Sequence, residues 1–112
     1  MPVIKNNWKI KYFTTSSGKI PVQEFIDALP VSLQAKIHNT FELLTEFGIQ
    51  IGQPHVKKIH HTPLWELRVL GKKSIRFFYL TQSKRTFLIL HAFVKKTPKT
   101  PKKEIKTALK RL

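Results

Sequence analysis

Apolar and polar residues alternate at the start of the chain and then recur at a longer spacing. Residues 8–13, WKIKYF, alternate with a period of two, which is typical of a β-strand that has one face in water. Two stretches follow in which apolar residues lie three and four positions apart. The first begins at Pro21, which suits the first position of a helix, and stops at Pro30, while the second ends at Gly48. The pattern predicts one strand followed by a hairpin of two helices.

Strand patterns dominate the second half of the chain. Residues 49–63 contain one glycine and two prolines, so they leave room only for a short strand near residues 56–59. After Pro101 the helical spacing returns, so the basic tail is expected to be an amphipathic helix with its lysines on the solvated face. Between these segments, three stronger strand patterns are joined by GKK and TQSKR turns, at residues 64–70, 74–80 and 86–94. Strands joined by such short turns form an antiparallel meander.

These elements fit one domain of the α+β class over residues 1–112. A chain of this length is long enough for one compact domain with a single core and too short for two domains that each bury a core of their own. The expected order is β-α-α-β-β-β-α. Two N-terminal helices are expected to pack on one face of an antiparallel sheet, with a further helix at the C-terminus.

Positive charge dominates the composition. Lys and Arg number 21 against 6 acidic residues, so the formal net charge is +15. A field of this size attracts polyanions such as nucleic acid. Cysteine is absent, which excludes disulfides and thiolate chemistry. The first residues lack the apolar run of a signal peptide and no run reaches membrane-spanning length, so we expect a cytoplasmic protein with no membrane partner.

Alternation along the predicted meander places several basic residues on the face away from the two helices. A three-residue GKK turn puts Arg68 directly across from Arg76, and a two-residue SK turn puts Arg76 across from His91. Like charges placed opposite each other destabilise a sheet, and an anion held by both arginines, such as a phosphodiester, would relieve the repulsion. Contact with solvent or pairing with Glu66 explains the arginines equally well. Beside two cations the neutral form of His91 is favoured, which suits a proton acceptor, although a lone histidine in a sheet is usually structural.

Aromatic and basic residues extend this face. Phe78, Phe87 and Phe93 are expected on it, where they could stack on bases or be covered by a partner protein or the terminal helix. Covering is the more usual reason for apolar residues on a second face. Lys95 and Lys96 follow the last strand, and strand ends commonly present site residues.

The distribution of acidic residues disfavours a metal site. All of them except Glu66 lie on predicted helices, so no carboxylate cluster at strand ends could hold magnesium. His55, His60 and His61 do not have the spacing of a zinc site, and no phosphate-binding glycine loop or serine nucleophile motif occurs. We therefore expect no metal and no cofactor, and chemistry carried by Arg, Lys, His and Tyr.

Several motifs resemble one known family. In order and spacing, VQEFIDALP, LLTEFG, LWELR, IRFFYL and HAFVKKTPKTPKKEIKTALKR resemble the phage-derived HigB-like branch of the RelE/ParE toxin superfamily, over about residues 20 to 111. The resemblance implies a RelE-like fold and the toxin of a type II toxin-antitoxin system. Such a toxin is a metal-independent endonuclease that cuts mRNA on the ribosome, by attack of the RNA 2′-hydroxyl on the adjacent phosphate. Its partner is a cognate antitoxin, often of the helix-turn-helix type.

The resemblance also implies roles for individual residues. Arg68 and Arg76 would clamp the phosphate and its transition state, and Lys95 and Lys96 would present cations to the scissile region. Two residues are candidates for acid and base and three for RNA binding, namely His91 and Tyr79, and Phe78, Phe93 and Lys99.

Two other functions fit the same sequence. A ParE-like inhibitor of DNA gyrase has the same fold but needs no catalytic cluster. An inert basic RNA-binding module needs only the positive charge. The proximity of Arg68, Arg76, His91 and Lys95 favours the endonuclease.

Overall fold

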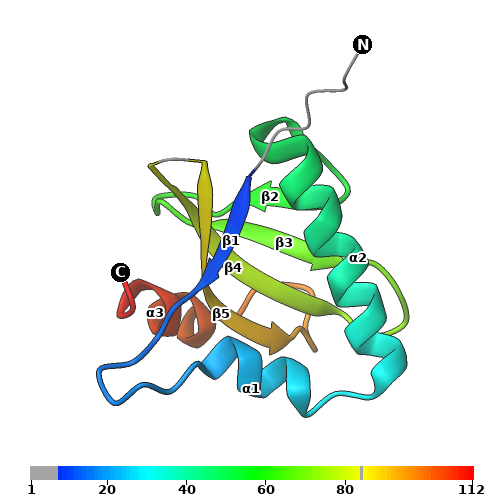
Figure 1. The fold of residues 1–112 in the computed structure, drawn as a ribbon, viewed down its shortest axis with the longest axis horizontal. Helices are drawn as coiled ribbons and strands as arrows, with labels where there is room; N and C mark the ends of the chain where they lie inside the picture. Colours follow the sequence, from blue (N-terminus) through cyan, green and yellow to red (C-terminus); the bar gives the residue numbers. More distant parts are fainter. Residues whose placement is uncertain (1–7, 84) are drawn as a thin grey trace.

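The computed structural model describes residues 8–83 and 85–112 of the chain. In this part of the chain one five-stranded sheet packs between helices (Figure 1). The elements are β1 (Lys9–Tyr12), α1 (Pro21–Asp27), α2 (Val31–Phe47), the 3-10 turn η1 (Gly48–Gln50), β2 (Val56–Lys58), β3 (Trp65–Val69), β4 (Ile75–Gln82), β5 (Thr86–Val94) and α3 (Lys102–Leu109). The predicted α+β class is confirmed. None of the helices described is long and apolar enough to cross a membrane.

Proline and glycine set the ends of the first two helices. Pro21 occupies the first turn of α1, and Pro30 is extended just before α2 begins. Gly48 ends α2 with a φ of 59°, a left-handed conformation that favours glycine. A side chain at this position would also collide with the indole ring of Trp8. The end of α2 is therefore fixed by the backbone and by the residue that precedes β1.

The strands lie in the order β1-β5-β4-β3-β2. The pairs β2–β3, β3–β4 and β4–β5 are antiparallel, as the short turns predict. β1 pairs with β5 in parallel, so the sheet is mixed rather than wholly antiparallel. The prediction was wrong on this point because short turns report only on strands that are neighbours in sequence, and β1 and β5 are not. The segment where only a short strand was expected forms β2.

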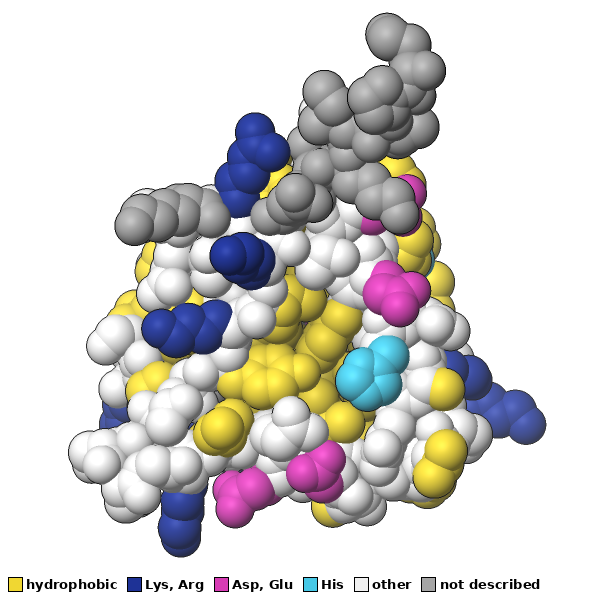
Figure 2. Space-filling view, viewed as in Figure 1, with side chains coloured by type: hydrophobic (Ala, Val, Ile, Leu, Met, Phe, Trp, Pro, Cys, Tyr) yellow, Lys and Arg dark blue, Asp and Glu magenta, His cyan; other side chains and the backbone are white. Residues whose placement is uncertain are grey.

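The sheet separates two hydrophobic cores. α1 and α2 cover one face, and α3 covers part of the other, next to β5 (Figure 1). The first core includes Ile26, Ile37, Phe41 and Phe77, and the second includes Leu64, Phe78, Phe93 and Ala108. On the side of α1 and α2, apolar side chains remain visible in a hollow between these helices and β1 (Figure 2).

A β-bulge in β5 changes which side chains face which core. Tyr79 pairs with Ile89 and Phe78 pairs with His91, so Leu90 is an extra residue without a partner on β4. Phe87 and Ile89 before the bulge face the first core, whereas Phe93 beyond it faces the second. The sequence prediction that placed Phe87 on the same face as Phe93 was wrong because it assumed unbroken alternation. Instead, the ring of Phe87 stacks on Trp8, with ring centroids 4.5 Å apart.

The register between β4 and β5 also differs from the prediction. Arg76 lies opposite Phe93, not opposite His91. Part of the difference comes from the turn, because Gln82 pairs with Thr86 and leaves three residues between them where two were expected. Residue 84, half of the expected SK turn, lies outside the described residues. The bulge at Leu90 contributes the rest.

Candidate functional site

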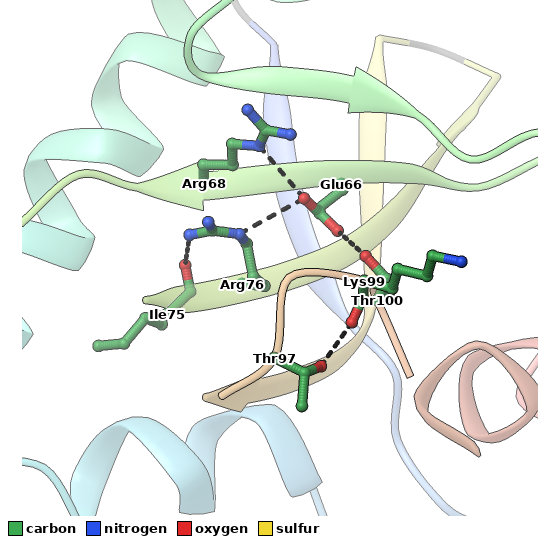
Figure 3. A network of polar contacts seen from close by, with 7 residues as sticks. All are labelled: Glu66, Arg68, Ile75, Arg76, Thr97, Lys99 and Thr100. Carbon is green, nitrogen blue, oxygen red and sulfur yellow. Dashed lines mark hydrogen bonds and ion pairs between the residues drawn. The ribbon is translucent and has the colours of Figure 1, made fainter. Parts of the chain in front are cut away.

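Two arginines from neighbouring strands contact one buried carboxylate on the face opposite α1 and α2 (Figure 3). Arg68 on β3 lies directly across from Arg76 on β4, as predicted. The Nε atom of Arg68 donates to Oε1 of Glu66 at 3.2 Å, and Nε of Arg76 lies 3.4 Å from the same oxygen. The Glu66 side chain is 1% exposed. We call these three residues the arginine cluster.

Glu66 is the anion that relieves the repulsion between the two arginines. Of the two explanations left open by the sequence, pairing with Glu66 is therefore confirmed. Burial lowers the pKa of Arg76 from its ordinary value, the charge of Glu66 raises it, and the charge of Arg68 lowers it. Two guanidinium groups and one carboxylate leave a net positive charge at the cluster, which can attract a second anion.

The contacts with Glu66 leave other guanidinium nitrogens available. Both arginines face Glu66 through Nε, and one terminal nitrogen of Arg76 donates to the carbonyl oxygen of Ile75 at 3.3 Å. Within residues 8–83 and 85–112, no contact engages the terminal nitrogens of Arg68. The cluster can therefore offer guanidinium N–H donors to a phosphate without breaking its contacts with Glu66.

The loop after β5 closes one side of the cluster. The Thr100 hydroxyl donates to the second oxygen of Glu66 at 3.1 Å, and the Thr97 hydroxyl donates to the carbonyl oxygen of Lys99 at 2.6 Å (Figure 3). The Lys99 side chain points away from Glu66 in this view. Lys95 and Lys99 line a cleft beside the cluster, whereas Lys96 is exposed outside it.

His91 is held by α3 instead of by the arginine cluster. Its Nε2 lies 3.1 Å from Oε1 of Glu104, and its Nδ1 lies 3.4 Å from a terminal nitrogen of Arg111. These contacts fit one neutral tautomer, in which Nε2–H donates to Glu104 and Nδ1 accepts from Arg111. Burial lowers the pKa of His91, Glu104 raises it, and Arg111 lowers it. The neutral form is favoured as expected, but through burial and Arg111 instead of through Arg68 and Arg76.

The aromatic candidates are buried. Phe78 and Phe93 belong to the core beneath α3, so their rings are not open to bases, and the covering by the terminal helix that the sequence favoured is confirmed. Tyr79 lies in the first core on the other face of the sheet, where burial raises the pKa of its hydroxyl. The structure therefore does not bring Tyr79 to the arginine cluster.

A family model described as phage derived protein Gp49-like (DUF891) matches residues 24–112. The chain belongs to this family. Gp49-like proteins are generally associated with toxin-antitoxin proteins of the RelE-like kind. The part of the chain that matches the Gp49-like family includes the whole arginine cluster and the loop that carries Thr100. A comparison with curated proteins gave no match.

Sequence reasoning missed two residues of the site in this Gp49-like chain. Glu66 was predicted as a possible partner of the arginines, from its position on the same face, but it was not given a place among the site residues. Thr100 had no such signal, because it lies 34 residues from Glu66 in sequence and reaches it only through the loop after β5. Within the described part of the chain, no group of three or more His, Cys, Asp or Glu residues could hold a metal ion.

Proposed function

We propose that the protein is the toxin of a type II toxin-antitoxin system, from the HigB-like branch of the RelE/ParE superfamily, and that it cleaves mRNA on the ribosome without a metal. The observation that carries the proposal is the arginine cluster, in which Arg68 and Arg76 converge on Glu66 with guanidinium donors to spare. The association of the Gp49-like family with toxin-antitoxin proteins supports it, as does the net charge of +15.

In this proposal the RNA itself supplies the nucleophile. The 2′-hydroxyl oxygen bonds to the adjacent phosphorus, the bond from phosphorus to the 5′-oxygen breaks, and a cyclic phosphate and a 5′-hydroxyl result. Arg68 and Arg76 donate to the phosphate oxygens, on which negative charge grows. Glu66, which is 1% exposed and has both oxygens engaged, positions the two guanidinium groups. The proton of the 2′-hydroxyl leaves to water, and the ammonium of Lys95 gives a proton to the leaving 5′-oxygen.

The other residues predicted for the site differ in what they contribute to the proposed reaction. Lys96, exposed at the end of β5, contributes positive charge near the RNA. Since both ring nitrogens of His91 are engaged, by Glu104 on α3 and by Arg111 just after it, and Tyr79 lies on the other face, neither is assigned a role in proton transfer.

Induced expression tests the function against its alternatives. We expect pulse-labelled protein synthesis to stop soon after induction while DNA supercoiling continues. If synthesis persists while gyrase-dependent supercoiling stops, the endonuclease proposal fails and a ParE-like inhibitor replaces it. Unimpaired growth at high expression would favour an inert basic module. Cleavage by the purified protein should persist in EDTA as long as the ribosome stays intact.

A cognate antitoxin, of the helix-turn-helix type and acidic overall or in part, is the proposed partner. Phe78, Phe87 and Phe93 cannot form its docking face, because all three are buried within this chain. An apolar pocket of about 270 Å³ offers another surface, and its lining includes Ile49, 71% exposed, and Trp65, 37% exposed. Co-expression with the product of the neighbouring gene, followed by pull-down, should give a complex that Ile49→Asp weakens. If no product of a neighbouring gene binds the protein, the proposal of a cognate antitoxin is contradicted.

A further inference from the structure

Four lysine residues line a cleft next to the arginine cluster. Lys57 and Lys58 come from β2, and Lys95 and Lys99 come from the segment after β5. The cleft between them has a volume of about 330 Å³. The fold thus brings together two pairs of lysines that are far apart in the sequence. We call this feature the lysine cleft.

The lysine cleft and the arginine cluster share a wall. Thr100 lines the cleft and also donates its hydroxyl hydrogen to Glu66. A chain lying in the cleft would therefore continue directly toward Arg68 and Arg76.

The positive charge of the lysine cleft is not neutralised by the described part of the protein. Within residues 8–83 and 85–112, the carboxylate ion pairs involve Arg68, Arg76 and His91, and none reaches the four lysines. The ammonium of Lys58 is turned away from the cleft, because it donates to the carbonyl oxygen of Thr62 at 2.8 Å and lies 5.2 Å from the centre of the Trp65 ring, which lines the apolar pocket on the other face of the sheet. The charge at the cleft therefore comes from Lys57, Lys95 and Lys99. Several like charges around one cleft focus a field that attracts a polyanion.

The floor and rim of the cleft suit a nucleic acid better than a simple anion. Ile59 and Ile105 provide apolar surface between the lysines, and the exposed ring of His60 lies at the edge. Cations that follow a backbone, with apolar and aromatic surface between them, are the usual features of a site for single strands. We propose that the lysine cleft binds the backbone of single-stranded RNA next to the phosphate held by the arginine cluster. This inference rests on the proposed function and identifies where the substrate extends beyond the reacting phosphate.

Two charge-matched triple variants test the proposal. The cleft variant carries Lys57→Gln, Lys95→Gln and Lys99→Gln, and Lys58 is left intact because its ammonium lies away from the cleft, on Thr62 and the Trp65 ring. The control variant makes the same change at three exposed lysines of β1, the loop after it and α2, namely Lys11, Lys19 and Lys36. Both variants lose the same amount of charge. Circular dichroism establishes that both are folded.

The probe is a fluorescent 2′-O-methyl RNA of about 12 nucleotides, whose blocked 2′-oxygens prevent cleavage. We expect the cleft variant to bind it at least about tenfold more weakly than the control variant. Each phosphate contact with a single strand contributes about 0.7 to the slope of log K against log salt, so loss of three contacts should lower that slope by about 2. Equal losses in both triple variants would show that net charge alone drives binding, and would overturn the proposal.

A poly-glutamate peptide of the same length separates RNA from an acidic protein segment. RNA should bind more tightly than the peptide at equal salt, because only RNA offers bases to stack on His60 and the apolar floor. A peptide that binds as tightly through the same lysines would overturn the RNA assignment. Ribosome-dependent cleavage is measured separately. Wild-type protein that binds RNA through the cleft but never cleaves mRNA would refute the proposed function and leave the cleft as an RNA site.

Discussion

Replacing Glu66 with Gln tests whether one carboxylate balances two guanidinium groups inside this protein. Gln has nearly the same size as Glu and can still accept the hydrogen bond from Thr100, but it removes the negative charge. Removing one partner from a buried ion pair costs about 3–5 kcal/mol, because the remaining charge is left uncompensated. The Arg68 side chain is 27% exposed and can turn toward water, which places the expected loss of unfolding free energy at about 3 kcal/mol.

A double-mutant cycle separates this charge effect from a loss of packing. Arg76→Met alone leaves Glu66 with one cationic partner, whereas Glu66→Gln with Arg76→Met removes opposite charges together. The double variant should be more stable than the sum of the two single losses predicts, by at least about 1 kcal/mol. Glu46→Gln, at an exposed carboxylate on α2, serves as the control and should change stability by less than about 0.5 kcal/mol.

Urea unfolding, followed by circular dichroism, measures the free energy of unfolding of all five proteins, including the wild type. A loss of about 3 kcal/mol corresponds to a fall in melting temperature of about 12 °C for a chain of this length. If Glu66→Gln is as stable as the Glu46→Gln control, or if the double variant is simply additive, then the arginine cluster is not a coupled buried group. Glu66 would then not be the residue that positions the two guanidinium groups.

Three further predictions concern single residues. Arg76→Lys keeps the charge but not the two-pronged guanidinium, so the rate of ribosome-dependent mRNA cleavage should fall by a factor of about 10² to 10³. A folded variant that cuts at the wild-type rate would show that Arg76 is not part of the site. Because burial lowers the pKa of His91 below its ordinary 6.5, the unfolded chain binds a proton more readily in the window just below pH 6.5. The free energy of unfolding should therefore decrease as the pH falls through that window, and urea titrations of His91→Gln should show a flatter dependence. Phe93→Ala should lower the unfolding free energy by about 3–5 kcal/mol, because the ring of Phe93 is buried beneath α3. A loss below about 1 kcal/mol together with weaker RNA binding would show instead that Phe93 stacks on RNA bases.

Local patterns were sufficient for most of the fold. Pro21, Pro30 and Gly48 set helix ends through backbone chemistry that can be read one residue at a time. The pairing of Arg68 with Arg76 was also correct, because the length of the short GKK turn determines it. The parallel pairing of β1 with β5 could not be predicted in this way, since the two strands meet through tertiary packing.

The site was less predictable than the fold for the same physical reason. The pairing of Arg68 with Arg76 was predicted correctly because they share one hairpin, whereas Thr100 reaches Glu66 from a distant loop. His91 was assigned to the wrong neighbours because a bulge leaves almost no trace in a run of apolar residues such as TFLILHAFV. Its true partners, Glu104 and Arg111, lie on and just after the terminal helix.

The bulge at Leu90 decides on which side of the sheet the end of β5 presents its charge. With strict alternation, a strand that turns Phe87 and Ile89 toward α1 and α2 would turn His91, Phe93 and Lys95 the same way. The extra residue reverses this order, so Lys95 lines the cleft beside Arg68 and Arg76. A deletion of Leu90 would therefore move Lys95 to the other face of the sheet while every charged residue stayed in the chain. Chain length within this one strand, and not only the identity of its residues, determines whether the arginine cluster and Lys95 share a face.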